Sequence, residues 1–112
     1  MARIIGRGRA LQLLRTGEQI GAAEAFRIGL VNAVVAPAEL LGAAAAMMGQ
    51  MLANAPLAIA LCIEAVDRGL DMSVDEGCAL EANHFGLLAA TDDMREGMRA
   101  FLEKRAAQFA GR

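Results

Sequence analysis

Residues 90–112, ATDDMREGMRAFLEKRAAQFAGR, decide the fold class, because their apolar side chains recur at helical rather than strand spacing. The positions on one side of the predicted helix are Met94, Met98, Phe101, Arg105 and Phe109. Asp93, with Glu96 three residues later, has the form of a capping box that begins the helix. The segment therefore predicts a closing amphipathic helix with the cation pair Lys104 and Arg105 at its far end.

Glycine and proline divide the preceding sequence into further helical segments. The predicted segments are 6–17, 21–29, 37–54, 57–69 and 73–90. Ser73 with Glu76 is a capping box for the last of these. Between them, β-branched residues in LVNAVV (30–35) favour a short extended segment that could pair with EQI (18–20). The prediction is a single all-α domain over 1–112, with six helices and at most one short β pair.

The composition is unusually apolar for a chain of 112 residues, at 56% with a mean hydropathy of +0.39. The excess of apolar residues predicts an exposed apolar surface that binds a partner. No apolar run reaches the 18 or so residues of a membrane helix, and the start has no separate hydrophobic leader. We therefore expect a cytoplasmic protein with no membrane partner. Cys62 and Cys78 lie in predicted helices without a C-x-x-C pattern, so both are expected to be reduced core thiols, with no disulfide or metal.

The first fifteen residues carry four arginines and no acid, namely Arg3, Arg7, Arg9 and Arg15. This cluster could bind phosphate, or it could be the solvated face of a helix. A nucleic-acid partner is a third possibility, which predicts binding that weakens steeply with salt. The overall pI of 5.3 argues against nucleic acid as the main partner.

The sequence shows no assembled active site. Its only histidine, His84, has no serine or reactive cysteine near it in sequence and is interpreted as a packed or surface residue. GRGRAL (6–11) lacks the third glycine of a dinucleotide fingerprint. Most carboxylates stand near predicted helix N-termini, where free N–H groups account for them without catalysis.

Three patterns follow one another along most of the chain. They are T-G-x-x-I-x-A-x-E-A at 16–25, G-L-V-N-x-V-V at 29–35 and D-D-x-x-E-G-M-x-A-F-L-E-K-R at 92–105. In this order and spacing the chain resembles the C-terminal part of the enoyl-CoA hydratase/isomerase, or crotonase, family. One departure is Gly21, where relatives often have an aspartate or serine cap.

The resemblance implies which functions this chain carries. In the family an N-terminal core of β-β-α turns supplies the backbone N–H pair that polarises the thioester and the glutamates that add water. The resemblance implies that this core is absent from the 112 residues. We therefore assign no catalytic residue, and neither Glu64 nor Glu81 is predicted to be catalytic. It implies two substrate contacts: Phe85, which packs against acyl-CoA, and Lys104, which reaches the nucleotide end of CoA, often in a neighbouring subunit.

Two hypotheses follow. In the first, the chain is the C-terminal helical domain of an acyl-CoA enzyme, most simply a 2-enoyl-CoA hydratase. It would assemble as trimers or hexamers, cover the acyl-CoA pocket and be inactive alone, whether as a fragment or beside a separately encoded catalytic half. No cofactor is expected, since the coenzyme A thioester is the substrate. In the second, the chain is a non-enzymatic, self-associating helical module that has lost acyl-CoA binding.

Overall fold

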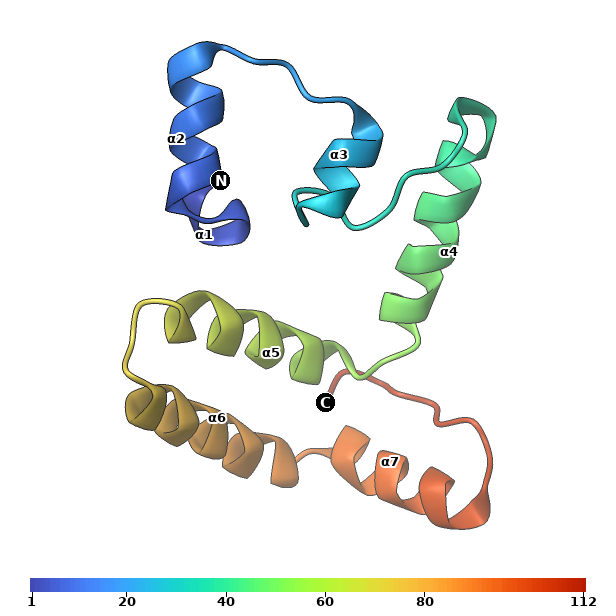
Figure 1. The fold of residues 1–112 in the computed structure, drawn as a ribbon. Coiled ribbons are helices and arrows are strands. Elements are labelled where there is room, and N and C mark those ends of the chain that lie inside the picture. The colour runs from blue at the N-terminus through green and yellow to red at the C-terminus, as the bar shows by residue number, and fades with distance from the viewer. The chain divides into compact units, whose positions relative to one another are not determined.

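The computed structural model describes all residues, 1–112, and consists of seven α-helices and one short 3-10 helix without a strand (Figure 1). The predicted all-α class is confirmed. The possible pairing of residues 30–35 with residues 18–20 does not form, because residues 30–32 are bends and residues 33–35 have no regular structure. The N–H groups of Leu30 and Val31 donate to the carbonyl oxygen of Ala25, at 2.8 and 3.4 Å, and so close the preceding helix instead of joining a ladder.

The chain forms two compact units, Met1–Ala43 and Ala44–Arg112, which are described separately. The first contains α1 (Ala2–Ile5), α2 (Arg7–Thr16), α3 (Ala22–Arg27) and the 3-10 helix η1 (Pro37–Glu39). Gly17 ends α2 in the left-handed conformation at φ 67°, as its place after the last periodic residue predicts. Helix α1 was not predicted as a separate element. The small core of this unit is made by Ile5, Ala10 and Ile28.

Helix α4 (Leu40–Leu52) begins in the first unit, and the second unit continues with α5 (Pro56–Gly69), α6 (Val74–Ala89) and α7 (Asp92–Glu103). Pro56 occupies the first turn of α5, where a missing N–H costs nothing. The Ser73–Glu76 capping box predicted for α6 is confirmed, with both reciprocal hydrogen bonds present. Helices α5 and α6 lie side by side and antiparallel, and α7 continues beyond the end of α6 (Figure 1).

The end of the chain differs from the prediction. Helix α7 begins at Asp92, and its N-cap is Thr91, whose hydroxyl accepts a hydrogen bond from the Met94 N–H at 3.1 Å. The predicted Asp93–Glu96 capping box is therefore wrong. The helix ends at Glu103, and residues 104–112 turn away from its axis and run back along it. Arg105 and Phe109, two of the predicted helix-face positions, therefore lie outside the helix. The physical reason is that both carboxylates accept hydrogen bonds from this returning tail. Glu96 accepts from the Arg105 guanidinium and the Gln108 N–H, and Asp93 accepts from the Ala110 N–H.

Few apolar residues are buried in either unit. Only five are, namely Ile5, Ala10, Ala25, Ile28 and Ala100, whereas large side chains such as Leu41 and Phe101 are more than four-fifths exposed. The expectation that Cys62 and Cys78 are core thiols is wrong, because both are exposed, although both are free. No single helix is long and apolar enough to cross a membrane; Pro37–Leu52 and Pro56–Gly69 pass that test only as a pair bent by 104°.

Candidate functional site

Phe85, a predicted substrate contact, lies on α6 beside a groove between α5 and α6. The groove encloses about 450 Å³ and is lined mainly by apolar side chains of the two helices. Gly69 and Gly77 come together at the end of the hairpin, where a Cβ on Gly77 would stand 4.0 Å from the Gly69 Cα. Phe85 is 61% exposed as a residue, so it offers an accessible aromatic side chain rather than a core contact. The groove can accept an apolar or stacking group.

His84 stands beside Phe85 with its ring buried, and neither ring nitrogen has a hydrogen-bond partner. Its Nε2 lies 3.7 Å from Oε2 of Glu64, which is too long for a hydrogen bond. Glu64 itself accepts from Arg68 at 2.7 Å, and this bond is the main reason that the pKa of Glu64 lies below its ordinary value. Of the two predicted alternatives, a packed or a surface histidine, the structure shows the packed one.

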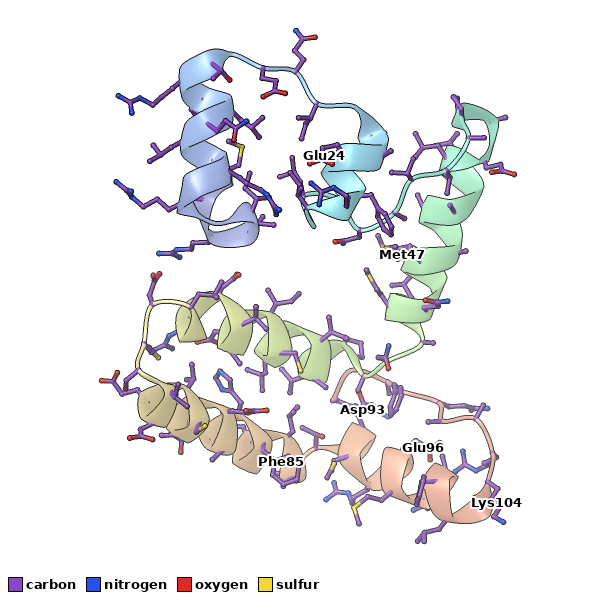
Figure 2. All side chains as sticks on the ribbon, viewed as in Figure 1. Glu24, Met47, Phe85, Asp93, Glu96 and Lys104 are labelled. Atoms are coloured by element: carbon purple, nitrogen blue, oxygen red, sulfur yellow. The ribbon has the colours of Figure 1, made fainter.

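Lys104, the other predicted contact, is the residue at which the chain reverses after α7 (Figure 2). Its backbone is left-handed, with φ 51°, and no other non-glycine residue of the chain has positive φ. Such a conformation costs a residue with a Cβ about 1 kcal/mol or more. The N–H of Lys104 donates to the Phe101 carbonyl at 3.3 Å, and that of Arg105 donates to Ala100 at 3.0 Å. The turn thus presents the only lysine of the chain at the tip of a helix.

Two carboxylates on α7 hold the tail that follows this turn. Glu96 accepts two hydrogen bonds from the Arg105 guanidinium, at 2.5 and 3.0 Å, and a third from the Gln108 N–H at 3.0 Å. Asp93 accepts from the N–H groups of Ala110 and Gly111, at 2.7 and 2.9 Å. The Asp93 N–H in turn donates to the Arg112 carbonyl at 3.0 Å. We call Asp93, Glu96 and their partners in the tail the tail clasp.

The tail clasp is electrostatically well matched. The hydrogen bonds from Arg105, together with that from Gln108, lower the pKa of Glu96 to about 2. The same contacts, with a further one to Glu103 at 2.6 Å, raise the pKa of the Arg105 guanidinium. Asp93 is only 4% exposed, and its buried carboxyl group accepts hydrogen bonds from two backbone N–H groups. Glu96 is therefore an ionised structural group and not a proton donor at neutral pH.

An apolar cavity of about 350 Å³ lies between the start of α5, the end of α6 and α7. The tail supplies part of its wall, because the Phe109 ring returns to Gly97 of α7, at 3.5 Å from where a Cβ would stand. The hydroxyl of Thr91 and the carboxylate of Asp93, both at its edge, are already hydrogen-bonded. This cavity offers no free polar group for chemistry.

The two predicted contacts do not line a common cavity: Phe85 borders the α5/α6 groove, and Lys104 borders none of the three hollows described for the chain. Figure 2 shows Phe85 on α6 and Lys104 at the turn after α7. No group of three or more histidine, cysteine or acidic side chains could hold a metal ion. The chain thus presents two separate surface features rather than one assembled active site.

Reasoning from sequence missed the tail clasp. Glu96 and Arg105 are nine residues apart, and Asp93 and Gly111 are eighteen apart, so neither pair has helical spacing. The one available signal was Thr91, a preferred N-cap residue just before Asp92 and Asp93. With Thr91 as the N-cap, the Asp93 carboxylate is not needed for capping and can accept hydrogen bonds from another part of the chain.

The chain is similar to known proteins along its whole length. The family model described as enoyl-CoA hydratase/isomerase matches residues 1–112. A crotonyl-CoA hydratase of Syntrophomonas wolfei is 48% identical over 109 residues, which are 97% of this chain and 42% of that protein. A short-chain-enoyl-CoA hydratase of Clostridium acetobutylicum is 42% identical, over 94% of this chain and 40% of that protein.

Solved structures are similar in fold as well. The enoyl-CoA hydratase of Bacillus anthracis superposes with a TM-score of 0.96 at 35% identity, over 99% of this chain and 43% of that one. An enoyl-CoA hydratase subunit of Geobacillus kaustophilus gives a TM-score of 0.93 at 41% identity, again over 99% and 43%. The chain spans about two fifths of the length of the relatives it matches.

Proposed function

Because the chain belongs to the enoyl-CoA hydratase/isomerase family, we propose that it is the helical, C-terminal part of an acyl-CoA-processing protein, most simply a 2-enoyl-CoA hydratase of fatty-acid metabolism. The observation that carries the proposal is the family match over residues 1–112, joined by the fold match to a solved enoyl-CoA hydratase. The relatives that support it are named as hydratases of crotonyl-CoA and of short-chain enoyl-CoA.

In this proposal the chain contributes binding and assembly rather than chemistry. Phe85 supplies an exposed ring for the acyl-CoA, and Lys104 supplies a cation for a phosphate at the nucleotide end of CoA. The separation of these residues within one chain fits a site completed by another subunit. No residue is proposed as catalytic, since the ring nitrogens of His84 have no hydrogen-bond partner and both clasp acids accept hydrogen bonds from the tail.

Assembly is the second half of the proposal. Helices α4 and α5 contain no buried residue, although α4 is apolar almost throughout. A helix that is hydrophobic all round is normally buried in something larger. We propose that these faces pack in a homo-oligomer, a trimer or a hexamer, or against a separately encoded catalytic half.

The test is isothermal titration of the purified chain with CoA and with a long-chain acyl-CoA, beside the Lys104→Ala variant. Arg99→Ala is the matched control, because Arg99 is an exposed cation in the last turns of α7, five residues before Lys104. Light scattering in the same buffer gives the oligomeric mass. Binding that weakens about tenfold in Lys104→Ala, and much less in Arg99→Ala, supports the proposal.

A second candidate is the non-enzymatic, self-associating helical module. The wide exposure of large apolar side chains favours it, since self-association alone would cover them. It predicts a defined oligomer that binds neither CoA nor acyl-CoA. That combination of results would contradict the acyl-CoA proposal.

A further inference from the structure

The tail clasp determines where the side chain of Lys104 is held. Lys104 carries the strain of a positive φ, and a residue with a Cβ keeps that conformation only where its surroundings fix it. The turn itself supplies two backbone hydrogen bonds, from the N–H groups of Lys104 and Arg105. The remaining restraint comes from the tail, which must run back along α7 for its contacts to form.

The contacts of the tail begin directly after the turn. Arg105 is the next residue, and its guanidinium is bonded to Glu96 and to Glu103 at once. Gln108, Ala110 and Gly111 then place their N–H groups on the same side of α7. A chain that continued as a helix past Glu103 would carry these donors away from both acids, so the clasp and the reversed turn require each other.

We propose that Glu96 and Asp93 are positioning residues for Lys104: by holding the returning tail they fix the left-handed turn from which the lysine ammonium reaches a phosphate of CoA. This inference rests on the proposed function, in which Lys104 is the phosphate contact. Glu96 acts on the ligand only through Lys104 and through the backbone that follows it.

Positioning by Glu96 and simple electrostatics predict opposite effects of Glu96→Gln on CoA binding. Glu96→Gln removes a negative charge near Lys104, so long-range attraction alone predicts tighter binding of anionic CoA. Loss of positioning predicts weaker binding, by about the factor lost in Lys104→Ala, roughly tenfold for a charge-assisted contact. Glu39→Gln is the matched control, because it makes the same charge change at an exposed glutamate of the first unit.

The single lysine makes the test direct. Reductive methylation with ¹³C-formaldehyde keeps the ammonium charged and labels one side chain, Lys104, apart from the chain's amino terminus. The ¹³C–¹H spectrum of the wild-type chain, Glu96→Gln and Glu39→Gln is recorded, followed by titration with CoA. Trypsin digestion of the unmethylated proteins, with mass analysis, reports whether the bonds after Lys104 and Arg105 become accessible when the clasp is broken.

A double-mutant cycle decides whether Glu96 acts through Lys104. We expect Glu96→Gln to weaken CoA binding about tenfold in wild type and to change nothing further in the Lys104→Ala background. Equal weakening in both backgrounds, or unchanged or tighter binding in wild type, would overturn the inference while leaving the proposed function intact. If Glu96→Gln lowers the helical circular dichroism, Arg105→Gln takes its place in the same cycle.

Failure of the proposed function gives a different result. If wild type binds no CoA and the Lys104 signal does not move on titration, both the proposed function and this inference are overturned. If the Lys104 signal and trypsin cleavage show a released tail in Glu96→Gln but CoA binds as in wild type, only the positioning role is overturned.

Discussion

The Asp93→Asn substitution tests the buried half of the tail clasp. Asp93 is 4% exposed, and its two carboxylate oxygens accept one hydrogen bond each, from Ala110 and Gly111. Asparagine keeps one acceptor oxygen but turns an NH2 donor toward the other N–H, which is then left without an acceptor. An unmade buried hydrogen bond costs about 1–3 kcal/mol, and the lost charge weakens the bond that remains.

We therefore expect the opening free energy of the tail to fall by about 2 kcal/mol, which corresponds to roughly 30-fold faster amide exchange. Hydrogen exchange measured by NMR at the Ala110 and Gly111 amides gives this number directly. The same substitution should also loosen Phe109, which follows the tail against Gly97.

Asp92→Asn is the matched control, since it makes the same chemical change one residue earlier on the same helix. Asp92 is exposed and pairs with the exposed side chains of Arg95, at 2.5 Å, and of Arg112 in the tail, at 3.9 Å; water and salt screen both contacts. We expect little change in tail exchange for this variant. Acceleration of less than about threefold in Asp93→Asn, or equal acceleration in both variants, would refute the claim that the buried carboxylate holds the tail.

Three further outcomes are expected. Ser73→Ala removes the hydroxyl of the α6 capping box and should lower the free energy of unfolding by about 1 kcal/mol, measured by urea titration with circular dichroism. Lys104→Gly relieves the strain of the left-handed turn, so it should raise tail stability by about 1 kcal/mol in hydrogen exchange while CoA binding falls, and a loss of stability would contradict the strain. The folded pKa of Glu96, about 2, lies below its unfolded value of about 4.3, so its stabilisation is complete above that value and is lost as pH falls toward 2. Tail exchange corrected for intrinsic rates should therefore rise across this interval in wild type and much less in Glu96→Gln.

Local signals in the sequence determined most of the helices. Gly17 and Gly29 have positive φ near the ends of their helices, Pro56 stands in the first turn of α5, and Ser73 with Glu76 caps α6. Each of these features depends on backbone groups within about four residues, so a short stretch of sequence contains both partners. The family patterns span the same local segments, which is why the all-α class and the family could be predicted without coordinates.

Only the tertiary structure shows the path of the last nine residues and which carboxylates accept hydrogen bonds from them. A carboxylate in the first turn of a helix can accept from its own helix or from any N–H group that returns to it, and spacing favours the first. Here Thr91 caps α7, and Asp93 and Glu96 bind a tail whose donors are up to eighteen residues away. Such pairs form only when the chain reverses its direction after α7. All the tail contacts together stabilise that reversal, so a local sequence pattern cannot predict it.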